Sequence, residues 1–229
     1  MPAMLSVVIP TLNAAAGLPA CLEALAPGRQ SGLIEEVVVS DGGSTDATRH
    51  IAEAAGASWL SGGPGRGGQL QRGAVAAGGE WLLFVHADTV LPPEWLFAVE
   101  SFIAEAGNAG RAAAFRFALD DPAPAARRHE ALVAWRCRRL GLPFGDQGLL
   151  LSRRLYGKAG GFRDLPLMED VDLVRRIGRR RLDILPVAAV TSAERYRRGG
   201  YWCRPLRNLT CLGLYFLGLP PRLLVRLYG

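Results

Sequence analysis

The chain has 229 residues, of which 49% are hydrophobic and 21% are charged, and this balance excludes an intrinsically disordered protein. The length predicts one domain with a large core. The formal net charge of +6 is unevenly spread, because twelve arginines between residues 174 and 226 are accompanied only by Asp183 and Glu194. This excess indicates an anionic neighbour such as phosphate or lipid headgroups. Since no nucleic-acid-binding motif accompanies it, we expect no nucleic acid partner.

Targeting signals and cysteine spacing bear on the compartment. The first apolar run, residues 5–9, is too short for a signal peptide and lacks a basic leader. The four cysteines, Cys21, Cys137, Cys203 and Cys211, show neither a CxxC pair nor the spacing of metal ligands. We therefore expect reduced cysteines and a cytoplasmic protein.

Strand and helix signals alternate through the first half of the chain. In chain order they predict strand 5–9, helix 18–25, strand 35–40, helix 47–55, strand 57–60, helix 69–77, strand 81–85, a helix from 92 to about 105, and strand 112–119. This alternation predicts an α/β fold of Rossmann-like type, with a mostly parallel sheet and helices on both faces.

From residue 122 onward the pattern changes. It predicts a helix over 125–140, a short strand over 148–152, a helix over 169–178, and one or two strands over 182–190. The segment 206–219 is strongly apolar, yet shorter than the roughly 18 to 20 residues that a spanning helix needs. We expect this tail to pack on the domain, with dimerisation or contact with a membrane surface as alternatives.

Polar residues follow two of the predicted strands. Asp41 comes directly after "VVVS", and Asp88 comes after "FVHA". Because the carboxyl ends of parallel strands share one edge of a sheet, both carboxylates should reach that edge. His86 should project on the same side as Asp88, since side chains two residues apart on a strand share a face. A simple turn beside Gly42 is the alternative for Asp41.

The glycine-rich stretch "SGGPGRGG" fits the GxGxxG pattern of dinucleotide-binding proteins. That pattern should close the first strand, which here ends in "IPTLN", and Pro64 occupies the position of the tight turn. We therefore interpret the stretch as a flexible loop that carries Arg66 near a diphosphate. A solvated surface loop is the alternative.

The stretch "PLMEDVDLVRR" places Glu169 and Asp170 at the start of a predicted amphipathic helix. One interpretation is charge that complements the helix dipole, and the other is a general base aimed into a pocket. A helix N-terminus lowers the pKa of a carboxyl and so weakens it as a base, whereas burial raises the pKa. The general base therefore requires that the carboxyl be buried.

Four motifs in order make the chain resemble the family 2 glycosyltransferases, which have the GT-A fold. They are "SVVIPTLN", "VVVSDGGSTDAT", "LLFVHADT" and "PLMEDVDLVRR", and the likeness covers roughly residues 5 to 180. The resemblance implies an enzyme that moves a sugar from a nucleotide-diphospho-sugar to an acceptor hydroxyl with inversion. It also implies assistance by a divalent cation, Mn²⁺ or Mg²⁺.

The resemblance also implies roles for particular residues. Asp88 should hold the cation, Asp170 should deprotonate the acceptor, and Asp41 should bind the base or ribose of the nucleotide. The other residues expected to contact the nucleotide are Pro10, Thr11, Asn13, Arg66 and Ala87.

One position departs from the family pattern, which commonly has Asp where this chain has His86. A nucleotide contact, a place in the metal shell and simple space filling are the three interpretations of this histidine. Asp146 and Gln147 in "FGDQGLLL", together with Glu169, are candidates for the acceptor side. In "SAERYRRGGYW", Arg195, Arg197 and Arg198 are candidates for a phosphate clamp, with a solvated basic surface as the alternative.

The implied organisation is a GT-A domain over 1–198 and a helical tail over 199–229. Within the domain, residues 1 to about 120 should bind the nucleotide and residues 121–198 the acceptor, which is lipid-linked if the tail contacts a membrane. Three alternatives to the transferase remain: a nucleotidyltransferase, a dinucleotide-dependent oxidoreductase, and a nucleotide-binding module without catalysis.

Overall fold

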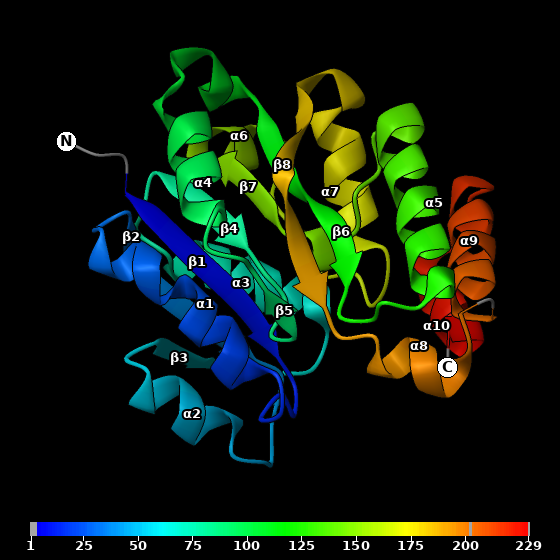
Figure 1. Ribbon diagram of the computed structural model, residues 1–229, viewed down its shortest axis with the longest axis horizontal. Coiled ribbons are helices and arrows are strands. Elements are labelled where there is room, and N and C mark those ends of the chain that lie inside the picture. Colours follow the sequence, from blue (N-terminus) through cyan, green and yellow to red (C-terminus); the bar gives the residue numbers. More distant parts are fainter. Residues whose placement is uncertain (1–3, 202, 229) are drawn as a thin grey trace.

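The computed structural model describes residues 4–201 and 203–228, and one eight-stranded sheet with the order β3-β2-β1-β4-β7-β6-β8-β5 lies at its centre (Figure 1). Four strands at one side of this order are parallel: β3 (Ser58–Ser61), β2 (Ile34–Asp41), β1 (Leu5–Thr11) and β4 (Trp81–Phe84). Because β1 lies between β2 and β4, the segments that follow all three strands leave the sheet at one edge.

The other half of the sheet is mixed. Strand β7 (Leu149–Ser152) is antiparallel to both β4 and β6 (Ala112–Leu119). Strand β8 (Leu182–Thr191) is parallel to β6, and the two-residue strand β5 (Thr89–Val90) pairs antiparallel with β8. The expected α/β fold is confirmed, and the segment expected to form one or two strands forms a single strand, β8.

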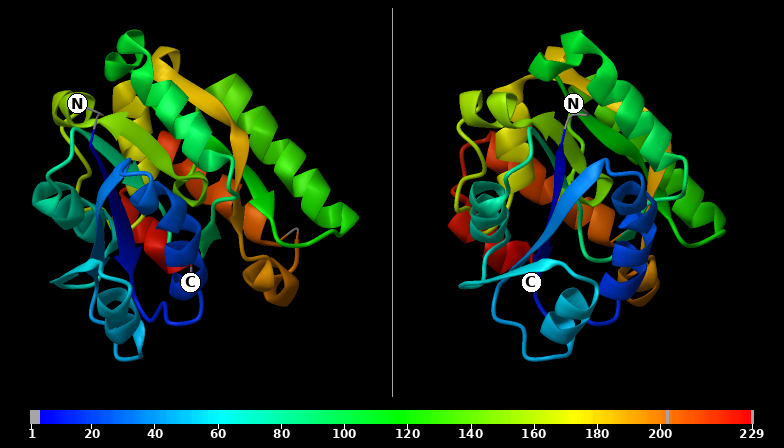
Figure 2. Two further views of the ribbon diagram at one scale, coloured as in Figure 1. Left: turned by 60° about the vertical axis from the view of Figure 1, so that its left-hand side comes forward. Right: turned by 90° about the vertical axis from the view of Figure 1, so that its left-hand side faces the viewer.

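Helices cover both faces of the sheet, as Figure 2 shows. On one face lie α1 (Leu18–Gln30), α2 (Thr48–Ala54) and α4 (Trp95–Ala104). On the other lie α3 (Arg66–Ala76), α6 (Arg153–Lys158), α7 (Glu169–Ile177), α9 (Cys203–Phe216) and α10 (Pro221–Tyr228). The remaining elements are α5 (Pro124–Leu140), α8 (Glu194–Gly199) and the short 3₁₀ helices η1 (Ala106–Gly110), η2 (Gly145–Gln147) and η3 (Arg179–Arg181).

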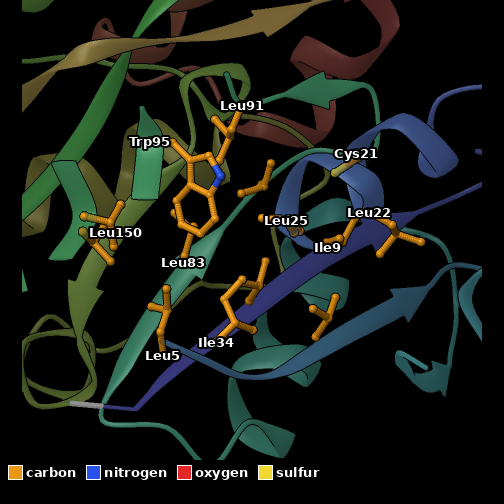
Figure 3. Close-up of a cluster of buried hydrophobic side chains, with 14 of the residues drawn as sticks. Leu5, Ile9, Cys21, Leu22, Leu25, Ile34, Leu83, Leu91, Trp95 and Leu150 are labelled. Atoms are coloured by element: carbon orange, nitrogen blue, oxygen red, sulfur yellow. The ribbon is translucent and has the colours of Figure 1, made fainter. Parts of the chain in front are cut away.

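The alternation of side chains along the strands explains the two cores. In β1, Val7 and Ile9 face the core under α1 and α4, whereas Val8 faces the core under α3 and α7. In the first of these cores Trp95 is fully buried among apolar side chains (Figure 3). Its indole N–H donates to the Ala24 carbonyl over 2.9 Å.

Helix α3 begins earlier than the glycine pattern predicts. The sequence suggests a loop up to Gly68, but the helix starts at Arg66. A Cβ on Gly67 would lie 2.3 Å from the Arg163 carbonyl oxygen, so this glycine lets the first turn pack against the backbone of the segment before α7. Arg66 is therefore held on a helix and not on the flexible loop that we expected.

The C-terminal tail belongs to the main core. Cys211 and Leu212 of α9 and Leu224 of α10 are buried in the core under α3 and α7. This confirms the expectation that the tail packs on the domain. Within residues 4–201 and 203–228, no helix combines the length and apolar character that crossing a bilayer requires.

Candidate active site

A cleft of about 740 Å³ opens at the carboxyl ends of β1 and β4. Its volume lies within the roughly 300–1,000 Å³ of small-molecule sites. A chamber of about 110 Å³ adjoins it. The residues that line both spaces are Arg66, His86, Asp88, Leu167, Glu169, Thr191 and Ser192.

The cleft brings together the residues that were expected to contact a nucleotide. Pro10, Thr11 and Asn13 come from the end of β1, Arg66 from the start of α3, and Ala87 from the segment after β4. Asn13 adopts a left-handed conformation with φ of 50°, and its side-chain oxygen accepts a 2.9 Å hydrogen bond from the Thr45 amide. The turn after β1 is thereby tied to the turn after β2.

Asp41 takes a different place from the other predicted contacts. It is 2% exposed and is not among the described residues that line the cleft or the chamber. Its carboxylate accepts from the hydroxyls of Thr11 and Ser44 and from the amides of Gly43 and Ser44. Burial would raise the pKa of this carboxyl, but these hydrogen bonds outweigh it and lower the pKa. In this structure Asp41 therefore shapes the turn below the cleft.

Buried Gln69 supports the same edge and was not found from the sequence. Its amide nitrogen donates to the backbone carbonyls of Thr11 and, over 3.1 Å, Ser40, so it joins the ends of β1 and β2. Nothing in the local pattern distinguishes this glutamine from a surface residue of a helix.

His86 and Asp88 both line the two spaces, but they lie in the turn after β4 and not on a strand, so the strand spacing from which the sequence predicted a shared face is not the reason. The N-terminus of α1 packs closely on this segment, since a Cβ on Gly17 would lie 2.9 Å from the Ala87 carbonyl oxygen. Beneath it, burial and then the negative charge of Asp88 raise the pKa of Cys21 to about 12, so that thiol stays protonated.

Glu169, the first residue of the acidic pair at the start of α7, is buried, as the interpretation of a general base requires. Glu169 is 2% exposed, and burial followed by the charge of Asp170 raises its pKa to about 7, against the opposing effect of Arg66. The Arg66 Nη1 atom lies 3.7 Å from Glu169 Oε1. Met168, which precedes the pair, has a left-handed φ of 65° that turns the chain into the helix.

Asp170 lines the chamber and is oriented by two amides. Gly145 N–H donates to Oδ2 and Val171 N–H donates to Oδ1, each over 2.7 Å. A Cβ on Gly145 would lie 2.6 Å from His86 Nε2 and 3.5 Å from Asp170 Oδ2. The imidazole and the carboxylate therefore face the same glycine.

The two acceptor-side candidates in η2 differ. Asp146 lines the chamber, and burial raises its pKa to about 6, with Asp170 and Asp88 adding to the shift and Arg136 and Arg66 opposing it. Gln147 is 1% exposed and, among the described residues, is absent from the lining of both spaces. Its amide donates to the Phe115 carbonyl over 2.9 Å and accepts from Arg136 over 3.3 Å. Gln147 therefore holds the η2 loop in place and does not face an acceptor.

The segment after β8, in which the sequence suggests a phosphate clamp, forms helix α8. Arg195 and Arg198 belong to this helix, but their side chains lie outside the described part of the structure. Arg197 lies 3.5 Å from Asp120 and 3.9 Å from Asp121, so it pairs with carboxylates at the end of β6.

The C-terminal helices also supply wall residues that the sequence did not reveal. Asn208 of α9 lines the chamber and Val225 of α10 lines the cleft. The Asn208 Oδ1 atom is buried and has no hydrogen-bond partner within the described residues. The tail, which the sequence places outside the GT-A domain, therefore closes part of the site.

A cleft at the carboxyl ends of parallel strands, lined by acidic side chains, is typical of nucleotide-binding α/β proteins. The chain belongs to the glycosyl transferase family 2, whose family model matches residues 6–182. This confirms the resemblance seen in the four sequence motifs.

Two mycobacterial proteins are among its relatives. One is a PGL/p-HBAD biosynthesis glycosyltransferase of Mycobacterium bovis (strain BCG / Pasteur 1173P2), 41% identical over an alignment of 117 residues, with 44% of this chain and 42% of the relative covered. The other is a glucosyl-3-phosphoglycerate synthase of Mycobacterium tuberculosis (strain CDC 1551 / Oshkosh), 34% identical over an alignment of 97 residues, with 38% of this chain and 30% of the relative covered. The chain thus spans less than half the length of either relative.

Solved structures of the Mycobacterium tuberculosis glucosyl-3-phosphoglycerate synthase share the fold. Its complex with Mn²⁺ and UDP-glucose has a TM-score of 0.61 at 21% identity, covering 90% of this chain and 78% of that chain. Its complex with Mn²⁺, UDP and glucosyl-3-phosphoglycerate has a TM-score of 0.59 at 21% identity, with the same coverage. The expected GT-A fold is confirmed.

Proposed function

We propose that this chain is an inverting glycosyltransferase that moves a sugar from a nucleotide-diphospho-sugar to an acceptor hydroxyl. The observation that carries the proposal is the joining of two sets of residues in one cleft. The expected nucleotide contacts Pro10, Thr11 and Asn13 line the same space as Asp88 and Glu169. Asp170 lies in the adjoining chamber. Family membership and the complexes of its structural neighbours with UDP and Mn²⁺ or Mg²⁺ support the assignment.

The candidate metal-binding side chains of this cleft fit a divalent cation that binds together with the nucleotide. Among the described residues, no group of three or more His, Cys, Asp or Glu side chains is arranged to hold a metal. Asp88 lines both spaces, and Mg²⁺ commonly binds through one or two carboxylates together with substrate phosphates. A cation bound there would neutralise the charge that develops on the leaving diphosphate.

The residues of the chain divide the remaining tasks. The turn after β1 and Ala87 cradle the nucleotide, while Arg66 places a guanidinium beside the diphosphate, which it can bind in bidentate fashion. Arg66 also lies next to buried Glu169, so the Glu169 carboxylate and the phosphates would compete for the Arg66 guanidinium.

Asp170 is our candidate for the general base. An alcohol is a weak nucleophile at neutral pH and needs a base within hydrogen-bond reach. Asp170 lines the chamber, and the Gly145 and Val171 amides fix its carboxylate, so a hydroxyl in the chamber can donate to it. A base on the side away from the leaving group gives attack in line and therefore inversion.

Thermal-shift measurements with UDP, GDP and NAD, each with and without Mn²⁺, test the proposal. We expect a nucleoside diphosphate to raise the melting temperature only with Mn²⁺, and ligand at 100 times its Kd to stabilise by about 2.7 kcal/mol. Stabilisation by NAD without metal would make the protein a dinucleotide-binding module and overturn the proposal.

Two substitutions separate binding from chemistry. Asp88→Ala should abolish the metal-dependent shift, because the cation loses its protein carboxylate. Asp170→Asn should keep that shift and lose the release of nucleoside diphosphate from the donor sugar. Full release by Asp170→Asn would show that another group is the base.

The acceptor and the compartment complete the proposal. We propose that the acceptor carries a hydroxyl on an end that is small enough to enter the chamber of about 110 Å³. We also propose that the protein acts in the cytoplasm. A lipid-linked acceptor would require that the protein reach a membrane surface.

A further inference from the structure

Helices α9 and α10 carry apolar side chains on two faces. One face is in the core, where Cys211, Leu212 and Leu224 are buried. The other is turned to solvent, and the large apolar residues exposed there are Leu206, Leu209, Phe216, Leu223 and Leu227, with Leu217 in the link between the two helices. Leu217 is 82% exposed and Leu206 is 67% exposed. Such a concentration on two adjoining short helices is typical of a surface that another body covers.

The periodicity of these residues shows that they form a face. On α9, Leu206, Leu209 and Phe216 are separated by three and seven residues, which places them on one side of a helix. On α10, Leu223 and Leu227 are four residues apart, and buried Leu224 between them holds the helix to the core. The two helices pack against each other.

The charged residues of the tail itself have one sign. The sequence from residue 203 to 228 contains four arginines and no Asp or Glu. Arg222 and Arg226 are exposed, and they are four residues apart on α10. Arg175 of α7 adds a guanidinium that lies 4.6 Å from the centroid of the Phe216 ring. Exposed leucines flanked by arginines are the pattern of helices that lie in the interface of a membrane.

We propose that the tail surface, formed by α9 and α10, docks on a bilayer of anionic lipids. Its leucines would enter the boundary of headgroups and acyl chains, and its arginines would contact lipid phosphates. A second copy of the chain fits less well. A twofold contact through this surface would bring arginines against arginines, with no carboxylate from the same helices to pair them.

The position of the surface relative to the site gives docking a consequence. Val225 of α10 lines the cleft and Asn208 of α9 lines the chamber, so the helices that touch the membrane also form walls of the site. Docking would hold these walls of the site close to the membrane surface and so bring the site near a hydroxyl on a lipid-borne acceptor. This consequence rests on the proposed transferase function, whereas docking itself does not.

Co-sedimentation with vesicles tests the proposal. The full chain is mixed with phosphatidylcholine vesicles and with phosphatidylcholine–phosphatidylglycerol vesicles, and we expect it to pellet with the second. The double variant Leu217→Ser/Leu223→Ser should lower the partition coefficient at least about tenfold, because two leucines no longer enter the interface. The double variant Arg222→Gln/Arg226→Gln should lower it about fivefold or more on anionic vesicles only.

Two controls make the test specific. Phe97→Ser removes a side chain that is 76% exposed on α4, on the opposite face of the sheet, and should leave partition unchanged. Asp170→Asn should bind vesicles as the wild type does, which separates docking from the proposed chemistry.

Three results would overturn docking: no pelleting with anionic vesicles, equal pelleting of the leucine variant, or equal loss in Phe97→Ser. If sedimentation velocity instead shows a dimer that Leu217→Ser/Leu223→Ser dissolves, the tail surface is a contact between two copies.

Discussion

Glu169 is almost fully buried beside Asp170, and this burial raises its pKa to about 7 from an ordinary value of 4.5. At neutral pH it can therefore hold or release a proton. An ionised Glu169 attracts the Arg66 guanidinium 3.7 Å away, and protonation weakens that attraction. At the scale of single residues, burial thus links the protonation of one carboxyl to the ion pair that it makes with Arg66, the residue which we propose contacts the diphosphate.

The raised pKa predicts how stability depends on pH. Below 4.5 the carboxyl is protonated in both the folded and the unfolded chain, so burial carries no ionic cost. As pH rises toward 7 the unfolded chain ionises first, and the contribution of Glu169 to stability falls. Glu169→Gln escapes this cost, so its melting temperature relative to wild type should rise between about pH 5 and about pH 8. The exposed Glu53→Gln is the control, and a relative melting temperature that is flat with pH would contradict the raised pKa.

Residue patterns predicted where the polar groups gather but not how each is used. The ends of β1 and β4 meet because parallel strands align their carboxyl ends, and this rule placed Pro10, Asn13 and Asp88 in one cleft. The hydrogen bonds that occupy Asp41 depend on the backbone of Gly43 and Ser44. Those bonds are set by turn geometry, which residue types alone do not specify.

At the scale of elements, the η2 loop lies against both His86 and Asp170. Gly145 supplies the amide that donates to Asp170, and its missing side chain leaves room for the imidazole. In Gly145→Ala the added Cβ would lie 2.6 Å from His86 Nε2, so either the ring or the loop has to move. We expect turnover of the donor sugar to fall at least about tenfold, since small displacements of a base are costly.

A matched control separates this effect from a general loss of helix geometry. Gly107 also lies in a 3₁₀ helix, and a Cβ there would meet nothing within 4 Å. Gly107→Ala should therefore leave turnover unchanged, and both variants should keep the metal-dependent thermal shift with nucleotide. Equal turnover in Gly145→Ala and Gly107→Ala would show that the η2 loop does not position the base.

The helices and strands were predicted correctly where their sequence pattern is local. The predictions failed where contacts with residues distant in sequence determine the bounds of an element. Helix α3 begins at Arg66 because Gly67 fits against the Arg163 backbone, almost a hundred residues away in sequence. Strand β5 consists of two residues that are ordered by pairing with the end of β8. Neither partner is visible in a short window of sequence.

At the scale of the whole molecule, the tail is both a part of the core and a wall of the site. The family model ends at residue 182, yet Cys211, Leu212 and Leu224 lie in the core under α3 and α7. The sequence suggests a boundary between domain and tail at residue 198. Stability measurements can test whether the tail folds as a separate part.

Neighbouring leucines of α10 provide that test. Leu224 is fully buried, whereas Leu223 is 49% exposed. If the tail is integral, Leu224→Ala should cost about 2–5 kcal/mol in the free energy of unfolding, because it removes core packing and leaves a cavity. Leu223→Ala should stay within about 0.5 kcal/mol of wild type, as surface substitutions do. Chemical denaturation followed by circular dichroism measures both, and equal, small effects would mean that α10 is an appendage which the domain folds without.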